Sequence, residues 1–363
     1  MTRAEIEREL LVWMREEPEL HDERRFERLA LALFAFQIEH AAPYRRFCEA
    51  RGASPATVSS WREIPAVPTG AFKELALRCF RAEATVKVFR TSGTALARRG
   101  ELHLDTLALY EASLVPSFEK GVLPDLAADE RLPMFVLAAS PTEAPDSSLS
   151  HMFGVMLERR GTTESACFVR HDELDVEALL AALEAVASAN RLLLCGTAFA
   201  FVHLLEAMEE RGRRLALPAG ARVMETGGFK GRARGLSRER LYAWIGERLG
   251  VPPGRCVNQY GMTELGSQFY DSVLREPEAS RRKLVPPWVR VSIVAPESGR
   301  EVRTGEPGVI RIVDLANTGS ALAIATADLG RALVGGFEVL GRAAGAEARG
   351  CSIAADEMLL ANA

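Results

Sequence analysis

The segment NQYGMTE at residues 258–264 decides the fold class of this chain. It follows a short apolar run that suits a buried strand, and it puts an aromatic ring, a glycine, a hydroxyl and a carboxylate within five positions. Such a set can stack a base, let a ligand approach the backbone closely, bind a phosphate and hold Mg²⁺. A strand that ends in a turn with a solvated glutamate is the alternative, and the segment alone does not choose between the two.

Strand-like segments alternate with helical periods before this segment. Strands are predicted at residues 134–139, 166–169, 191–194 and 222–224. Between the second and the third, apolar residues from Val176 to Val186 recur with the spacing of one helix face. Another helix is predicted to begin after Ser237 as N-cap and to end at Leu249, before Gly250. This alternation predicts an α/β fold with a mostly parallel sheet.

The two ends of the chain have a different character. The first part is predicted to be helical, because Phe26, Leu29, Ala30 and Leu33 lie on one helix face. Residues 64–72 hold two prolines and a glycine, which predicts a connector. From residue 289 onward, short strands and turns predict antiparallel hairpins. The predicted parts are an N-terminal helical region (1–85), an α/β core (86–288), a β-rich sub-domain (289–345) and a C-terminal tail (346–363).

Composition excludes several classes of protein. The 45 basic and 49 acidic side chains leave a formal net charge of -4, so we expect neither a nucleic-acid binder nor a membrane-surface protein. Acidic residues stand near the N-terminus where a secretory signal has its apolar core, and the longest apolar run is too short to span a bilayer. A cytoplasmic location is therefore expected. The six cysteines show neither a disulfide nor a zinc pattern.

Other segments could also bind parts of a nucleotide. TSGT at residues 91–94 offers hydroxyl and backbone donors to phosphate oxygens, and paired glycines at residues 227–228 let a flat ligand lie against the backbone. Asp328, in ADLG, is expected to follow a strand and could hold ribose hydroxyls, and Gly341 and Arg342 come later in the chain. Each of these segments, taken separately, is explained equally well by an ordinary turn.

The order of these segments along the chain, however, resembles a known signature series, and the segments are TSGT, GG, YGMTE, ADLG and GR. The series is that of the acyl-adenylate-forming superfamily, which includes acyl-CoA synthetases, luciferases and peptide-synthetase adenylation domains. The chain is more closely similar to the acyl-protein synthetase family. Five strings carry this similarity: IPAVPTGAFK, FRTSGT, ETGGFKGR, NQYGMTELGSQFYD and GAEARGCS. The best-known member of that family is the synthetase subunit of the bacterial bioluminescence fatty-acid reductase. The resemblance implies the large N-terminal domain of the adenylate-forming fold, with the α/β core binding the adenylate, and an ATP- and Mg²⁺-dependent ligase that joins an acid to a thiol.

The resemblance also implies roles for individual residues. The phosphate loop would be Thr91, Ser92, Gly93 and Thr94. The adenine pocket would be formed by Tyr260, which stacks on the base, with Gly227, Gly228 and Gly261. Thr263 would contact the α-phosphate and Glu264 would hold Mg²⁺, while Asp328 and Arg342 would bind the ribose. His151, in SHMFG, would lie beside the acyl carboxylate, although a structural histidine is the alternative.

Two departures from the superfamily pattern concern positive charge. Residues 95–99 are ALARR where the superfamily has glycine and lysine, and arginine does not replace lysine freely. The relatives' mobile C-terminal domain, with its catalytic lysine, is expected to be absent, since the last lysine is Lys283. Lys230, Arg98 or a residue of a partner protein could supply the charge instead.

The acyl acceptor implied by the resemblance is Cys351, because the family carries its acyl group on a cysteine near the C-terminus. Neighbouring Arg349 would favour the thiolate, and Gly345 and Gly350 would let the tail move. A small core residue at a strand end is the alternative.

The predicted function is ATP-dependent activation of a carboxylic acid, transfer of the acyl group to Cys351, and hand-over to an acyl reductase partner. A fatty acid is inferred from the relatives only, because no residue pattern fixes the chain length. Two alternatives remain open: an acyl-CoA ligase that uses coenzyme A directly, and a non-catalytic nucleotide-binding subunit.

Overall fold

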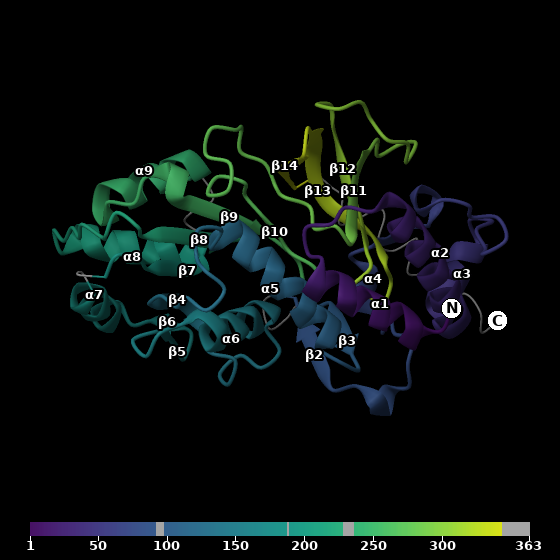
Figure 1. The fold of residues 1–363 in the computed structure, drawn as a ribbon, viewed down its shortest axis with the longest axis horizontal. Coiled ribbons are helices and arrows are strands. Elements are labelled where there is room, and N and C mark those ends of the chain that lie inside the picture. The colour runs from purple at the N-terminus through teal and green to yellow at the C-terminus, as the bar shows by residue number, and fades with distance from the viewer. Residues whose placement is uncertain (92–97, 187–188, 228–235, 343–363) are drawn as a thin grey trace. The chain divides into compact units, whose positions relative to one another are not determined.

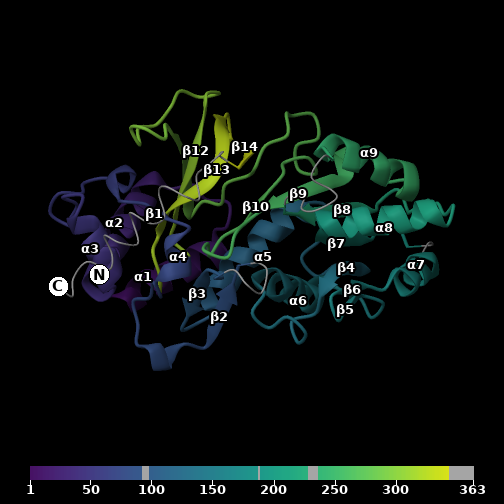
Figure 2. The same ribbon diagram turned by 180° about the vertical axis from the view of Figure 1, so that it is seen from behind.

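The computed structural model describes residues 1–91, 98–186, 189–227 and 236–342 (Figures 1 and 2). They form two compact units. Unit 1 contains Met1–Ser117, Met262–Gln268 and the described residues from Arg282 onward, and unit 2 contains Phe118–Gly261 and Phe269–Arg281. Unit 1 thus combines the predicted helical region with the predicted β-rich sub-domain. The four contiguous ranges predicted above stay a prediction.

Unit 2 is built on a seven-stranded sheet with the order β10-β9-β8-β7-β4-β5-β6. The parallel strands are β4 (Met134–Ala139), β5 (Ala166–Arg170), β7 (Leu193–Thr197), β8 (Arg222–Thr226) and β9 (Cys256–Tyr260). Antiparallel β6 (Glu173–Leu174) and β10 (Phe269–Tyr270) form the two edges. The predicted parallel sheet is confirmed, although β7 begins at Leu193 rather than Arg191 and continues through Cys195 to Thr197.

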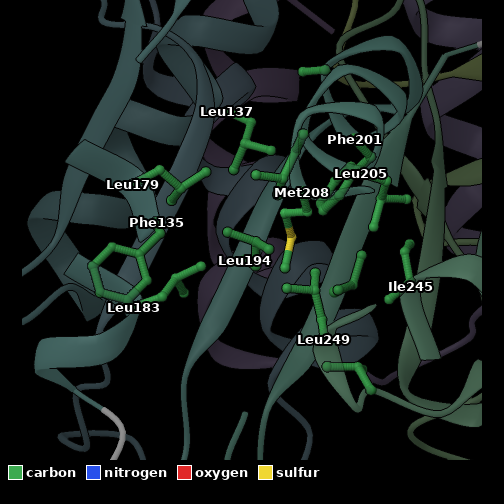
Figure 3. Packing of buried hydrophobic residues seen from close by; sticks show 14 of the residues in the cluster. Phe135, Leu137, Leu179, Leu183, Leu194, Phe201, Leu205, Met208, Ile245 and Leu249 are labelled. Carbon is green, nitrogen blue, oxygen red and sulfur yellow. The ribbon is translucent and has the colours of Figure 1, made fainter. Parts of the chain in front are cut away.

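The helices of unit 2 after the first strand are α6 (Ser148–Arg160), α7 (Val176–Ala185), α8 (Ala198–Glu210) and α9 (Arg238–Leu249). Figure 3 shows Met208 of α8 beside Leu194 of the sheet. Both belong to one buried cluster that also includes Leu205 of α8, Ile245 of α9 and residues of α7. The predicted α9 is confirmed: the Ser237 hydroxyl caps its first turn, and it ends where Gly250 takes φ +72°.

Unit 1 contains a five-stranded sheet in which β1-β13-β12-β11 are successive neighbours and β14 pairs with β13. Its antiparallel strands are β11 (Val289–Val294), β12 (Pro307–Asp314), β13 (Ala323–Leu333) and β14 (Gly336–Arg342), which confirms the predicted hairpins. A separate hairpin joins β2 (Lys87–Arg90) to β3 (Glu101–Leu104).

The prediction that residues 64–72 are only a connector is wrong. This segment contains β1 (Val67–Pro68), which pairs in parallel with Ile324 and Ala325 of β13, and the first two residues of the short helix α4 (Ala71–Glu74). Pro68 is tolerated because β1 lies at the edge of the sheet, where a missing N–H leaves no ladder bond unmade.

The remaining helices are α1 (Arg3–Glu16), α2 (Glu23–His40), α3 (Ala42–Glu49) and α5 (Ala108–Val122), and α5 crosses from unit 1 into unit 2 after Ser117. The predicted apolar face of α2 is confirmed, since Phe26, Leu29, Ala30 and Leu33 are fully buried. Among the described helices, none is long and apolar enough to cross a membrane.

Candidate active site

The first group of predicted site residues lies in unit 1, around Glu264. Thr91 follows β2, and its N–H donates to the Gly100 carbonyl (2.9 Å) while the Gly100 N–H donates to the Thr91 hydroxyl (2.8 Å). A Cβ built on Gly100 would lie 3.1 Å from Thr91 Cγ2 and 3.6 Å from Glu264 Oε1. The start of the predicted phosphate loop and the predicted metal ligand are therefore close together.

The Glu264 carboxyl is buried, and burial raises its pKa from 4.5 to about 7. The positive charges of Lys73 and Arg342 offset part of that rise in pKa, and the Asp328 carboxylate adds to it. A buried carboxylate is costly to ionise unless a cation neutralises it, so Glu264 fits a divalent cation.

No cluster of three or more metal-binding side chains exists in the described part of the chain. Mg²⁺ is commonly bound by one or two carboxylates together with substrate phosphates. Glu264 and a bound phosphate group would thus be enough to hold it.

Asp328 and Arg342 are brought together as a pair on neighbouring strands β13 and β14. Arg342 Nε lies 3.8 Å from Asp328 Oδ1. The prediction that Asp328 follows a strand is wrong, because it lies inside β13, just before a register irregularity at Leu329 and Gly330. Pairing with β12 and β14 continues the strand past Asp328, whose N–H donates to the Thr326 hydroxyl (3.1 Å).

The second group lies in unit 2, where β8 and β9 end side by side. Gly227 follows Thr226, which pairs with Gln259, and Tyr260 is the next residue of β9. Gly227 takes φ +89°, and a Cβ there would meet nothing within 4 Å. The open backbone at Gly227 and the half-buried ring of Tyr260 thus belong to one edge of the sheet, where parallel α/β sheets bind ligands.

A buried polar network lies below this edge, and sequence reasoning missed it. Glu225 Oε1 accepts hydrogen bonds from the Tyr242 hydroxyl and from Asn258 Nδ2, both at 2.8 Å. The Asp271 carboxylate accepts from the Asn258 N–H (3.0 Å) and from Arg281. These bonds tie the ends of β8 and β9 to α9 and to the segment after β10.

His151 lies in the first turn of α6, the helix that follows β4. Its N–H donates to the Ser147 carbonyl (3.0 Å), and its side chain is half-buried. Its role beside an acyl carboxylate stays a prediction.

Several predicted residues lie outside the described residues: Ser92, Gly93, Thr94, Gly228, Lys230 and Cys351. Arg98, one of the candidates for the missing charge, forms a solvent-exposed ion pair with Glu74 (2.7 Å).

Lys73 is the functional candidate that sequence reasoning missed. It belongs to α4, next to Phe72, whose Cβ lies 3.6 Å from a Cβ built on Gly100. Lys73 is the last residue of the family string IPAVPTGAFK, so the sequence did contain a signal for it. Nothing in that string, however, indicates that Lys73 lies near Glu264 in the fold.

The described cysteines have thiols of low reactivity. Burial raises the thiol pKa of Cys48, Cys79 and Cys256 to about 12, and that of Cys167 to about 11. Burial also raises the pKa of Cys195, at the centre of the sheet, well above its ordinary value. Each therefore stays a protonated thiol near neutral pH.

The fold is similar to that of solved 2-hydroxyisobutyryl-CoA ligase structures. The postadenylation state with 2-HIB-AMP gives a TM-score of 0.64 at 16% identity, covering 90% of this chain and 69% of that one. The open conformation with 2-HIB-AMP and CoA gives 0.62 at 17% identity, covering 88% and 70%. The chain therefore has the fold of the adenylate-forming enzymes, which confirms the predicted fold class.

Sequence comparison makes the class more specific. A model of the acyl-protein synthetase (LuxE) family matches residues 10–360. The chain is 22% identical over 307 residues to the long-chain-fatty-acid–luciferin-component ligase of Vibrio harveyi, and 24% identical over 309 residues to that of Aliivibrio fischeri. In each case 84% of this chain and 78% of the relative are covered. The chain belongs to the acyl-protein synthetase family, and it is a ligase.

Proposed function

We propose that this ligase activates a carboxylic acid with ATP as an acyl-adenylate and then transfers the acyl group to the thiol of Cys351. The observation that supports it best is the buried carboxyl of Glu264 beside Thr91, in a member of the acyl-protein synthetase family. Such a carboxyl ionises when a divalent cation binds to it, and phosphate oxygens can be further ligands of that cation. The site therefore suits a metal–nucleotide complex.

In the first step the acid's carboxylate oxygen bonds to the α-phosphorus, and the bond to pyrophosphate breaks. Mg²⁺, when bound, neutralises charge on the phosphate oxygens. Glu264 would hold that ion, Thr91 and residues 92–94 would orient the phosphates, and Thr263 would contact the α-phosphate. Lys73, whose positive charge lowers the pKa of Glu264, would add charge to stabilise the phosphates.

The proposed nucleoside contacts are those that the family resemblance implies. Tyr260 stacks on the adenine, and Gly227 and Gly261 let the base lie against the backbone. Asp328 accepts hydrogen bonds from the ribose hydroxyls, and Arg342 orients Asp328 from the neighbouring strand. His151 contacts the acyl carboxylate.

In the second step the Cys351 thiolate attacks the acyl carbon, a thioester forms and AMP leaves. The raised pKa values of the five described cysteines support this assignment, since a protonated, buried thiol is a poor nucleophile. Arg349 favours the thiolate of Cys351.

The acid is proposed to be a fatty acid, because both relatives are named long-chain-fatty-acid ligases. The same names give a luciferin component as the second substrate of those ligases, which supports transfer of the acyl group to an acceptor. We propose an acyl reductase that takes the thioester from Cys351.

The decisive experiment follows the mass of the intact protein with ATP, Mg²⁺ and straight-chain acids from acetate to palmitate. We expect an acyl adduct that hydroxylamine removes and that Cys351→Ala does not form. Cys167→Ala is the matched control, because it removes another thiol and should keep the adduct. Release of pyrophosphate without an adduct would favour coenzyme A as the acceptor. No pyrophosphate release with any acid, in the presence or absence of the reductase, would favour a non-catalytic subunit.

A further inference from the structure

The segment Met262–Gln268 carries Thr263 and Glu264 and belongs to unit 1, although the residues on both sides of it belong to unit 2. It lacks helix and sheet pairing of its own. The position of Glu264 therefore depends on what holds this segment within unit 1.

The support is the turn between β12 and β13, residues 314–322. Asn317 Nδ2 donates to the Glu264 carbonyl (2.8 Å) and to the Ala321 carbonyl (3.3 Å). The Asn317 side chain is buried, and its Oδ1 has no hydrogen-bond partner among the described atoms. The amide group thus serves as a donor to Glu264.

The same turn holds the end of the segment. Asp314 Oδ1 accepts from the Ser267 hydroxyl (2.7 Å) and from the Ala316 N–H (3.0 Å). Between the two anchors, a Cβ on Gly266 would lie 2.8 Å from Ala316 Cβ, too close for any residue larger than glycine. The turn and the segment are therefore packed against each other from Glu264 to Ser267.

Asn317 is itself fixed from the other side by α2. Gln37 Nε2 donates to the Asn317 carbonyl (2.7 Å), and Gln37 Oε1 accepts from the Leu322 N–H (2.9 Å). Since Gln37 is fully buried, the turn has a rigid support behind it.

We propose that Asn317 is the positioning residue that sets the place of the Glu264 carboxylate for the metal–phosphate complex. It acts through the peptide of Glu264 and does not touch the ligands. This inference rests on the proposed role of Glu264.

The test compares Asn317→Leu, which keeps the size but loses the donor, with Ser320→Ala. Ser320 lies on the same turn and is equally buried, but its hydroxyl donates to the Leu77 carbonyl (2.8 Å), away from Glu264. Three quantities are measured: the Mg²⁺ concentration for half-maximal pyrophosphate release, the MgATP-induced rise in melting temperature, and hydrogen exchange of residues 262–268.

For Asn317→Leu we expect the half-maximal Mg²⁺ concentration to rise by about 10- to 100-fold, as for other residues that support a metal ligand, with kcat recovering at saturating Mg²⁺. The MgATP-induced rise in melting temperature should shrink, and residues 262–268 should exchange faster. Ser320→Ala should keep the wild-type Mg²⁺ requirement. An unchanged Mg²⁺ requirement in folded Asn317→Leu, or an equal increase in Ser320→Ala, would overturn the proposal.

Failure of the proposed function is distinguishable from failure of this inference. If the wild-type protein neither releases pyrophosphate nor is stabilised by MgATP, the proposed function is wrong. Hydrogen exchange still decides the positioning role in that case: faster exchange of residues 262–268 in Asn317→Leu alone supports it, and equal exchange in both variants contradicts it.

Discussion

Glu264, the proposed Mg²⁺ ligand, is expected to lower the stability of the protein when no ligand is bound. Its carboxyl is buried, and the nearest charges only partly offset the cost of ionising it. Nothing in the packing of the segment Met262–Gln268 requires an acid at this place, since the segment is anchored through Asn317 and Asp314. The side chain is therefore expected to stabilise a ligand complex and to destabilise the protein without ligand.

The cost of burying the Glu264 carboxyl can be measured through the pH dependence of the free energy of unfolding. The pKa of Glu264 is about 7 in the folded protein and 4.5 when unperturbed. The folded form therefore holds a proton that the unfolded form has lost, and the free energy of unfolding falls as pH rises from about 4.5 to about 7, then levels off. Removing the carboxyl in Glu264→Gln should raise the free energy of unfolding at pH 8 by up to on the order of 3 kcal/mol, and by little at pH 4.5.

Urea unfolding at several pH values, without nucleotide, tests this prediction. Glu63→Gln is the control, because hydrogen bonds from the backbone and side chain of Ser59 lower the pKa of the Glu63 carboxyl. Its substitution should change stability with pH in the opposite direction. An effect of Glu264→Gln that is the same at pH 4.5 and pH 8 would contradict the burial argument.

The cysteines allow a second prediction at the residue scale. With thiol pKa values of about 11 to 12, the described cysteines other than Cys195 hold fewer than about one thiolate in a thousand molecules at pH 7.5. Burial also raises the pKa of Cys195 well above its ordinary value. Iodoacetamide should therefore modify the native protein quickly at one position, Cys351. Intact mass should show one fast adduct, absent in Cys351→Ala, and the remaining thiols should react only in denaturant. Two fast adducts would mean that a second thiol is accessible.

At the scale of elements, α8 provides a matched pair of substitutions. Leu205 is fully buried against the sheet (Figure 3), whereas Phe199, in the first turn of the same helix, is 55% exposed. Leu205→Ala should lower the free energy of unfolding by about 2–5 kcal/mol, because it leaves a cavity. Phe199→Ala should change it by less than about 0.5 kcal/mol. Chemical denaturation measures both, and a larger loss for Phe199→Ala would contradict the packing described here.

The elements also show what the sequence can predict. Local signals identified β4, β5, α7 and α9, because each has its own apolar period and its own cap or turn. They did not reveal β1, which is two residues long and exists only through its pairing with β13, distant in sequence. Asp328 was placed after a strand for a similar reason, since β13 continues beyond it through pairing with β12 and β14, which the local sequence does not show.

The candidate site shows the same limit of prediction from the sequence. YGMTE, Asp328 and Arg342 are visible as motifs with a role. Lys73 and Glu225 stand in the quoted family strings without a role, and Asn317 stands in none of them. Their roles come from tertiary contacts, and no local period marks them. Asn317 in particular is an ordinary turn residue in sequence and becomes important only through its bond to the Glu264 carbonyl.

At the scale of the whole molecule, the chain passes between the two units four times: after Ser117, Gly261, Gln268 and Arg281. Helix α5 continues through the first of these crossings. The short unit 1 segment Met262–Gln268 connects β9 and β10, which are paired neighbours in the sheet of unit 2. Loss of unit 1 structure would therefore fray α5 and loosen one edge of that sheet.

We accordingly expect the two units to unfold together. Cys79 reports on unit 1 and Cys195 on unit 2, because both thiols are buried and react only after their unit opens. In urea, alkylation of the two positions, followed by peptide mass spectrometry, should give the same midpoint. Leu205→Ala changes only unit 2, yet it should lower both midpoints equally if unfolding is cooperative. A lower midpoint at Cys195 with an unchanged one at Cys79 would show instead that unit 1 is stable without unit 2, and that the four crossings do not couple them.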